Sequence, residues 1–309
     1  KAVGKTFVYD LNNATNQNTG HISFTWVQRG SAITWDDIGI GESGGSVEIS
    51  KDGNTVLVCP GVYDIGQGGS SSVAARVFTW NGTDWIQKGQ DLGLPALPSE
   101  DLLDGSRQFV CDSAMSDDGS IIALSERVYN TRGIVRVYEY NTSTSQWDIR
   151  HDFIGEKGQH IGSAIGMSTD GTRVAFFGHE GNPSVTRANR LNITYGDFTF
   201  TAYDWNGSSY TQVGDTVKFA RSDEPGKNLH SGGGRILKHT GQQPQIDFIG
   251  NAVDSKTGAQ FPPTVVALNV QLDEDVSPSS ASKTIVLRLV GNTWVQQGSD
   301  FLAGTDNNI

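Results

Sequence analysis

Residues 112–125 read DSAMSDDGSIIALS and carry the strongest indication of how this chain folds. Their centre, Ser116-Asp117-Asp118-Gly119, stands between two runs that are rich in strand-forming residues. Asp-Gly in this setting predicts a tight hairpin turn, because glycine supplies a positive φ and the aspartate side chain accepts hydrogen bonds from the turn backbone. The stretch therefore predicts two antiparallel strands joined by a short turn.

The same block recurs along the chain. Residues 46–59 read SVEISKDGNTVLVC around Asp52-Gly53, and residues 164–178 read AIGMSTDGTRVAFFG around Asp170-Gly171. A degraded copy at 232–250, GGGRILKHTGQQPQIDFIG, carries Gly241 at the turn. A residue that a turn requires recurs with the turn, whereas an active site occurs once. We therefore interpret the repeated pairs as structural: Asp52 and Gly53, Asp118 and Gly119, Asp170 and Gly171.

A second hairpin follows each of these blocks and carries an aromatic residue at a fixed position. The four copies are VFTWNGTDWIQKG at 77–89, VRVYEYNTSTSQWDIRH at 135–151, FTAYDWNGSSYTQVG at 200–214 and IVLRLVGNTWVQQG at 285–298. The aromatic residues, which we call anchors, are Trp85, Trp147, Tyr210 and Trp294, and a lone copy of the block near the start has Trp26. We expect these large, flat side chains to fill the space between stacked sheets.

The order of blocks is thus a half repeat at 1–30 followed by four full repeats, at about 41–92, 105–153, 161–217 and 231–300, in a single domain of 309 residues. Four short strands per repeat are typical of a β-propeller blade. The sequence predicts an all-β fold, a propeller-like array of four four-stranded antiparallel sheets with an N-terminal orphan hairpin. That hairpin can form a thin fifth blade, pack outside the four sheets, or pair with another copy through its edges.

Composition narrows the classes of function. The net charge is −11, with 34 acidic residues against 23 basic ones, which argues against nucleic acid and against anionic membrane surfaces as partners. No run approaches the roughly 20 apolar residues of a spanning helix, so we expect no membrane insertion. Glycine is abundant, at 38 residues, and only 18% of residues are charged, which disfavours a helical bundle.

The sequence contains no pattern that indicates a metal or another cofactor. None of the six histidines has the spacing of a zinc site. The acidic clusters Asp36-Asp37, Glu100-Asp101 with Asp104, and Asp273-Glu274-Asp275 lack the alternating calcium loop and are interpreted as solvated loops. Cys59 and Cys111 form either a bridge or, as we favour, two buried thiols. We predict no catalytic residues, although a hydrolase with paired carboxylates in a central funnel stays open.

Five Asn-x-Ser/Thr sequences point to an extracellular alternative. They begin at Asn13, Asn81, Asn141, Asn192 and Asn206. Such sequences are glycosylated in secreted proteins, but three of them coincide with hairpin turns, where the geometry already selects asparagine. The alternative function is an extracellular adhesion or carbohydrate-binding propeller that uses loop aromatics and Asn or Asp side chains.

The two blocks together resemble a repeat that is common in large proteins of diatoms and related algae. The residues that carry the resemblance are Ser50-Lys51-Asp52-Gly53, Ser116-Asp117-Asp118-Gly119, Ser168-Thr169-Asp170-Gly171 and the segment from Trp80 to Gly89. This repeat is distantly similar to the blades of integrin-α heads, but the calcium loops of those blades are absent here. Among the algal proteins, the chain resembles the diatom pyrenoid shell proteins (PyShell), which are also acidic and β-rich and have no evident active site.

That resemblance implies a non-catalytic structural protein that self-assembles into a sheet or shell-like lattice. Its expected partner is itself, with Rubisco or other pyrenoid proteins as further partners, and its expected location is the chloroplast pyrenoid, the site of CO2 fixation. The residues themselves support self-association, since the half repeat has no matching half in this sequence and unpaired strand edges are templates for addition of another chain.

Overall fold

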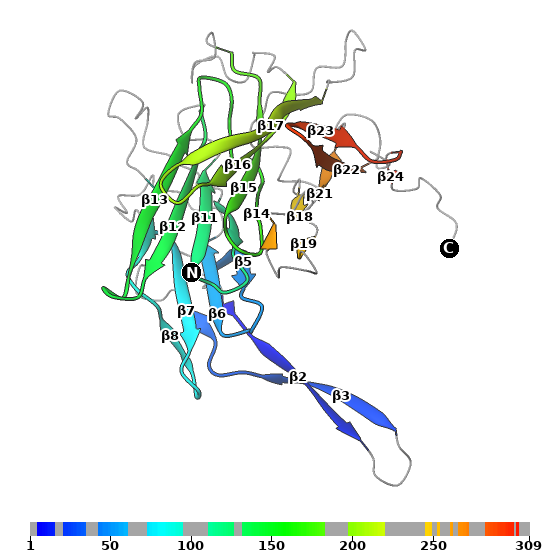
Figure 1. The fold of residues 1–309 in the computed structure, drawn as a ribbon. Helices are drawn as coiled ribbons and strands as arrows, with labels where there is room; N and C mark the ends of the chain where they lie inside the picture. The colour runs from blue at the N-terminus through cyan, green and yellow to red at the C-terminus, as the bar shows by residue number, and fades with distance from the viewer. Residues whose placement is uncertain are drawn as a thin grey trace, which may run out of the picture.

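The structure, a computed structural model, describes residues 5–15, 21–34, 43–60, 73–94, 111–126, 132–182, 197–219, 245–248, 252–253, 260–261, 265–271, 282–299 and 301–302. Every regular element in these ranges is a β-strand (Figure 1). A search of these residues finds no helix of the length and apolarity that crossing a membrane requires. The predicted all-β class is confirmed.

Four antiparallel sheets follow one another along the chain, and within each sheet most neighbouring strands are consecutive. The first contains β5 (Ser43–Ile49), β6 (Thr55–Pro60), β7 (Val73–Trp80) and β8 (Trp85–Gln87). The second contains β10 (Cys111–Met115), β11 (Ile121–Glu126), β12 (Ile134–Asn141) and β13 (Gln146–Ile154). The third contains β14 (Ile165–Met167), β15 (Arg173–His179), β16 (Phe198–Trp205) and β17 (Tyr210–Phe219). The fourth contains β18 (Gln245–Phe248), β21 (Val265–Gln271), β22 (Ser282–Val290) and β23 (Thr293–Gln296).

The sheets stack face to face, as a propeller-like array requires. Their first strands contact one another in the order β5, β10, β14, β18. A separate hydrophobic cluster lies between each successive pair of sheets: Leu57 and Val77 meet Ile122 and Trp147 between the first two. Because both faces of an inner sheet are covered, its strands are buried on both sides: all six residues of β11 are buried, including Ser125 and Glu126.

Short strands extend this plan beyond the predicted four per sheet. β9 (Leu92–Gly93) pairs with β7, and β24 (Phe301–Leu302) pairs with β22, so the first and fourth sheets have five strands. Two further two-stranded sheets join β1 (Lys5–Thr6) to β4 (Ile33–Thr34) and β19 (Ala252–Val253) to β20 (Gln260–Phe261). The degraded turn at Gly241 lies outside the described residues, but the expected hairpin at 232–250 is wrong in its second strand. The run after Gly241 contains β18, which is the first strand of the fourth sheet and pairs with β21.

The N-terminal hairpin projects away from the four sheets (Figure 1). Its strands β2 (Tyr9–Thr15) and β3 (Ile22–Gln28) pair with each other. Only the base of the hairpin is anchored, where Val8 and Ile33 pack against Val56 and Trp85 of the first sheet. Every residue of β3 is exposed. Within the described residues the hairpin is therefore neither a fifth blade nor an outer layer of the body.

Candidate functional site

The three Ser-x-Asp-Gly turns have the same hydrogen bonds. In the third sheet the Ser168 hydroxyl donates to Asp170 at 2.6 Å and accepts the backbone N–H of Arg173 at 2.8 Å. Asp170 also accepts the N–H of Thr172 at 3.0 Å. The glycine, Gly171, has φ 68°, a value that favours glycine. The turns at Ser50 and Ser116 repeat these contacts.

These contacts keep the repeated aspartates ionised. The hydrogen bonds from Ser50 and Asn54 hold the pKa of Asp52 below its usual value. Burial raises the pKa of Asp118 and of Asp170, but the hydrogen bonds from Ser116 and Ser168 and from the turn backbone outweigh it, so both pKa values are also lowered. All three carboxylates accept hydrogen bonds from their own turns, as residues with a structural role would.

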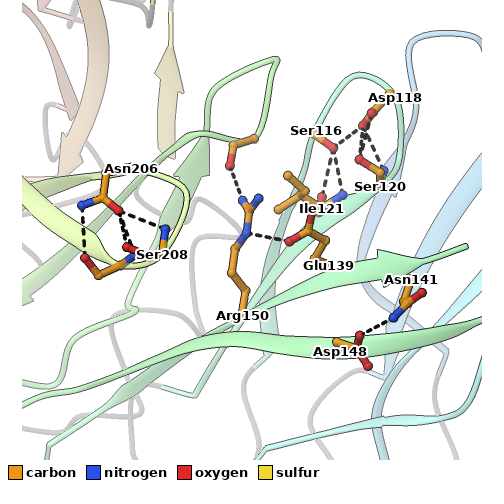
Figure 2. A network of polar contacts seen from close by, with 12 residues as sticks. Ser116, Asp118, Ser120, Ile121, Glu139, Asn141, Asp148, Arg150, Asn206 and Ser208 are labelled. Atoms are coloured by element: carbon orange, nitrogen blue, oxygen red, sulfur yellow. Dashed lines mark hydrogen bonds and ion pairs between the residues drawn. The ribbon is translucent and has the colours of Figure 1, made fainter. Parts of the chain in front are cut away.

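Successive turns are also joined to one another. In the first two turns the residue after the serine donates its N–H to the equivalent carbonyl of the next turn: Lys51 to Asp117 and Asp117 to Thr169, both at 2.8 Å. Figure 2 shows the second turn, with Ser116 and Ser120 directed at Asp118. The repeated block therefore fixes the spacing of neighbouring sheets as well as its own hairpin.

Three of the anchor tryptophans join their sheets to the hairpin that precedes each of them in the chain. The indole Nε1 of Trp85 donates to the carbonyl of Arg29 at 2.8 Å, that of Trp147 to Lys88 at 2.8 Å, and that of Trp294 to Val213 at 3.0 Å. In every case the acceptor lies three residues after the preceding anchor. These three indoles are 9%, 2% and 7% exposed, respectively.

The residue after each of these acceptors is a glycine, and the indole fits there because glycine has no side chain. At Gly89, with φ 77°, a Cβ would stand 2.6 Å from Cδ1 of Trp147, and at Gly214, with φ 71°, it would stand 2.5 Å from Nε1 of Trp294. Real Cβ atoms do not approach so closely, so any larger residue would displace the ring. We call the residues three and four positions after each anchor the acceptor segments: Arg29-Gly30, Lys88-Gly89, Arg150-His151, Val213-Gly214 and Gln297-Gly298.

Tyr210 and His151 replace this pair at the third junction. Tyrosine has no indole N–H, and His151 stands where the other acceptor segments have glycine. The two rings lie 5.5 Å apart, centroid to centroid, and Phe153 lies 5.2 Å from Tyr210. His151 is larger than the glycine of the other junctions, and the ring of Tyr210 is smaller than an indole, so the two changes compensate for each other in volume.

Basic side chains in the acceptor segments add a further link. The cations of Arg29, Lys88 and Arg150 lie 4.6–4.7 Å from the ring centroids of Trp80, Tyr140 and Trp205, which are the strand partners of the next anchors. The same cations donate to the glycine carbonyls of the next turns, Gly53, Gly119 and Gly171, at 2.9–3.2 Å. Arg150 also reaches Glu139 at 3.1 Å (Figure 2).

Sequence reasoning missed these three cations, although a signal for them was present. Each lies three positions after an anchor, and three of the five blocks have a basic residue there. Their partners lie across the junction in the next repeat. Only the folded arrangement shows that Arg29 meets Trp80 and Gly53 together.

Trp26 differs from the other anchors because it is 66% exposed. Strand pairing places Tyr9, Leu11, Ile22, Phe24 and Trp26 on one face of the hairpin β2–β3. Each of them is at least 49% exposed. The opposite face carries mainly polar residues, such as Asp10, Asn12 and Thr25. We call the five apolar side chains the hairpin face.

The other predicted candidates are placed as follows. Cys59 is a free, buried thiol, so it is not bridged to Cys111. The sequon residues Asn81 and Asn206 accept backbone hydrogen bonds inside their own turns. Within the described ranges, no three His, Cys, Asp or Glu side chains come together as metal ligands. The three acidic clusters and Asn192 lie outside the described residues.

Comparison with known proteins adds little to this picture. No protein-family model and no curated protein matches the sequence. Solved structures that resemble the fold include a protein from Bacteroides fragilis described as a 6-phosphogluconolactonase, with a TM-score of 0.43 and 10% identity over 96% of this chain and 68% of that one. The Kuenenia stuttgartiensis hydrazine synthase has a TM-score of 0.40 and 8% identity over 85% of this chain, which spans about half (49%) of the synthase chain. Sqt1 of Saccharomyces cerevisiae has a TM-score of 0.34 and 11% identity over 85% of this chain and 62% of that one. The assignment to an all-β, propeller-like repeat fold therefore rests on the sheets and junctions described above.

Proposed function

We propose that this protein is a non-catalytic structural protein that assembles with copies of itself into a sheet or shell-like lattice. The observation that carries the proposal is the exposed hairpin face. Phe24 and Trp26 are 64% and 66% exposed, and Leu11 is 50% exposed on the strand beside them. A contiguous apolar patch of this kind marks a surface that binds another protein.

The stability of the hairpin supports the same conclusion. An isolated two-stranded hairpin is marginally stable in water, because it buries too little apolar surface. In β2–β3 the side chains of Tyr9 to Ala14 and of Ile22 to Gln28 are exposed on both faces, and only its base packs against the first sheet. Contact with a second molecule would cover the apolar face and stabilise the hairpin.

The repeated carboxylates support a non-catalytic role. Asp52, Asp118 and Asp170 each accept hydrogen bonds from their own turn, and the structure uses each of them in the same way. Catalysis by paired carboxylates needs two such groups that face one substrate from different environments. The resemblance to the diatom pyrenoid shell proteins adds a setting, a chloroplast shell around condensed Rubisco.

Electron microscopy and light scattering of the purified protein test the proposal. We expect ordered assemblies whose amount rises with protein concentration. Phe24→Ser should weaken assembly, whereas Ile149→Ser, at a residue 54% exposed on β13, serves as the matched control and should leave it unchanged. A wild-type protein that stays a monodisperse monomer at high concentration would contradict the proposal, and glycans at Asn81 or Asn206 would then favour extracellular adhesion.

The cellular setting has its own test. A fluorescent fusion expressed in a diatom should surround the Rubisco condensate as a thin layer. A diffuse signal in the chloroplast, or secretion from the cell, would contradict the pyrenoid setting and leave the assembly property to be judged from the purified protein.

A further inference from the structure

We infer that the assembly contact is a head-to-tail copy of the junctions inside the chain, in which Trp26 of one molecule docks on Gln297-Gly298 of a second copy. This inference rests on the proposed self-assembly and names its partner and its residues. It follows from three features of the two positions: the free anchor, the free acceptor segment, and the chemical match between them.

The free anchor is Trp26. Trp85, Trp147 and Trp294 each donate an indole N–H to an acceptor segment and are at most 9% exposed, whereas Trp26 is 66% exposed. Within the described part of this molecule, no acceptor segment lies opposite Trp26.

The free acceptor segment is Gln297-Gly298. Gly298 has φ 74°, within a few degrees of Gly30, Gly89 and Gly214. In those three glycines a Cβ would collide with a side chain of the next sheet, but at Gly298 no described residue lies within 4 Å of that point. Gln296 donates to the Gly298 carbonyl at 3.2 Å, as Gln87 does to Gly89 at 3.3 Å, so the backbone already has the form that receives an indole.

The chemical match concerns the residue beside each anchor. Where the anchor's strand partner is aromatic (Trp80, Tyr140 or Trp205), the acceptor segment supplies a cation that stacks on it. Where the partner is Leu289, beside Trp294, the acceptor segment supplies the uncharged Val213. Trp26 has Leu11 as its partner, and the free acceptor segment supplies the uncharged Gln297. The N-terminal hairpin and the C-terminal segment therefore match the junction between the third and fourth sheets, in which a leucine beside the anchor faces an uncharged acceptor residue.

Apolar surface continues beside the acceptor segment. Strand alternation places Val290 and Val295 on the face of the fourth sheet opposite Leu289 and Trp294, away from the third sheet. They are 56% and 42% exposed, so the rest of the hairpin face would cover them as it docks. In Figure 1 the hairpin and β23 lie at well-separated parts of the molecule, which favours a second copy over closure onto the same chain.

A head-to-tail contact of this kind leaves one free anchor and one free acceptor segment at the ends of every oligomer. Unless the rotation between copies closes a ring, the assembly grows without limit. This property permits a sharp test with two complementary variants. Trp26→Ala removes the anchor. Gly298→Asn blocks the acceptor segment, because asparagine tolerates a positive φ but adds a side chain where the indole must lie.

Each variant alone should stay monomeric at concentrations where the wild type assembles, with the assembly midpoint raised at least about tenfold, as for an interface tryptophan. Their equimolar mixture should form a 1:1 dimer and nothing longer, since one intact contact remains. Sedimentation velocity and mass photometry give these masses. The controls are Val27→Ala on the opposite hairpin face and Gly291→Asn at another open glycine of positive φ.

The outcomes separate this inference from the proposed function. Wild-type protein that does not assemble would overturn both. Assembly by wild type, Trp26→Ala and Gly298→Asn alike would overturn the head-to-tail contact and leave the structural role standing. A mixture of the two variants that stays monomeric, or that elongates, would also overturn it, and circular dichroism of each variant shows that the fold is retained.

Discussion

Ser168 shows how a single buried hydroxyl supports a repeat. It is 0% exposed, donates to Asp170, and accepts the backbone N–H of the buried Arg173. The hydroxyl thus satisfies one backbone donor that water cannot reach, and it also lowers the pKa of the aspartate that caps the turn. The same geometry at Ser50 and Ser116 makes these serines the residues on which each hairpin depends.

We expect Ser168→Ala to lower the free energy of unfolding by about 1–3 kcal/mol, because it leaves the Arg173 N–H buried without that acceptor. Ser208→Ala is the control, since Ser208 is exposed and its hydroxyl bonds only to Asn206. That change should cost less than about 0.5 kcal/mol. Urea denaturation measures both, and equal losses would contradict the role assigned to Ser168.

Because the pKa of Asp112, on β10, is raised in the folded protein, we expect the free energy of unfolding to depend on pH. Burial raises its pKa to about 6, although Oδ2 accepts the N–H of Ile165 at 2.9 Å. The pKa in the unfolded chain is about 3.9, so between these values the folded state binds the proton more tightly. The contribution of Asp112 to the free energy of unfolding therefore falls as the pH rises from about 4 to about 6.

Asp112→Asn should relieve this penalty, because the neutral amide oxygen can accept the same hydrogen bond. We expect the variant to be more stable than wild type by about 1–3 kcal/mol at pH 8, with the difference shrinking toward pH 4. Denaturation curves across this range measure it. A difference that does not change with pH would show that Asp112 is not buried as a charge.

At the scale of the element, the junction between two hairpins is the unit of construction. Trp147 contributes a ring that is 2% exposed, a hydrogen bond to Lys88, and an edge that fits against Gly89. Since the anchor belongs to one sheet and the acceptor segment to the preceding one, neither sheet can form the junction alone. Stability in such arrays is approximately a sum of unit and nearest-neighbour terms.

Gly89→Ala tests the junction, with Gly82→Ala as a matched control in the same hairpin. Both glycines have positive φ, but a Cβ at Gly82 meets nothing within 4 Å, whereas at Gly89 it would stand 2.6 Å from Trp147. We expect about 1–2 kcal/mol of backbone strain at Gly82 and at least about 2 kcal/mol more at Gly89. Thermal denaturation and tryptophan fluorescence should show both the loss of stability and the displaced indole.

At the scale of the whole molecule, charge and the assembly contact act in opposite directions. Each copy carries a net charge of −11, so neighbouring copies repel one another. The contact that we propose consists of uncharged residues, including Leu11, Trp26 and Gln297. Salt screens the repulsion over a distance of about 10 Å at 0.1 M and leaves the apolar contact in place.

We therefore expect assembly to increase as sodium chloride is raised from low to moderate concentration. Light scattering at constant protein concentration measures the effect, and Trp26→Ala should show no comparable rise. If salt instead dissolved the assemblies, ion pairs rather than the hairpin face would hold the copies together.

Much of this architecture could be predicted from local pattern. Asp-Gly between apolar runs specifies a hairpin without reference to the rest of the chain, and its recurrence at Asp52, Asp118 and Asp170 indicates repeated sheets. The short additions β9 and β24 were missed, since strands of two residues have no periodicity. The cations Arg29, Lys88 and Arg150 were missed because their partners lie in the next repeat.

Local sequence specifies the all-β class and the three Ser-x-Asp-Gly hairpins, because these depend on the conformational preferences of a few adjacent residues. The first hairpin of the fourth repeat was misplaced, since its turn lacks the Asp-Gly signal. Which anchors are buried, in contrast, depends on the folded arrangement of the whole chain. Trp26 and Trp85 stand in equivalent blocks, yet one is 66% exposed and the other 9%, since burial depends on whether an acceptor segment lies opposite. That difference is set by the stacking of sheets, a property of the whole fold that no single block encodes.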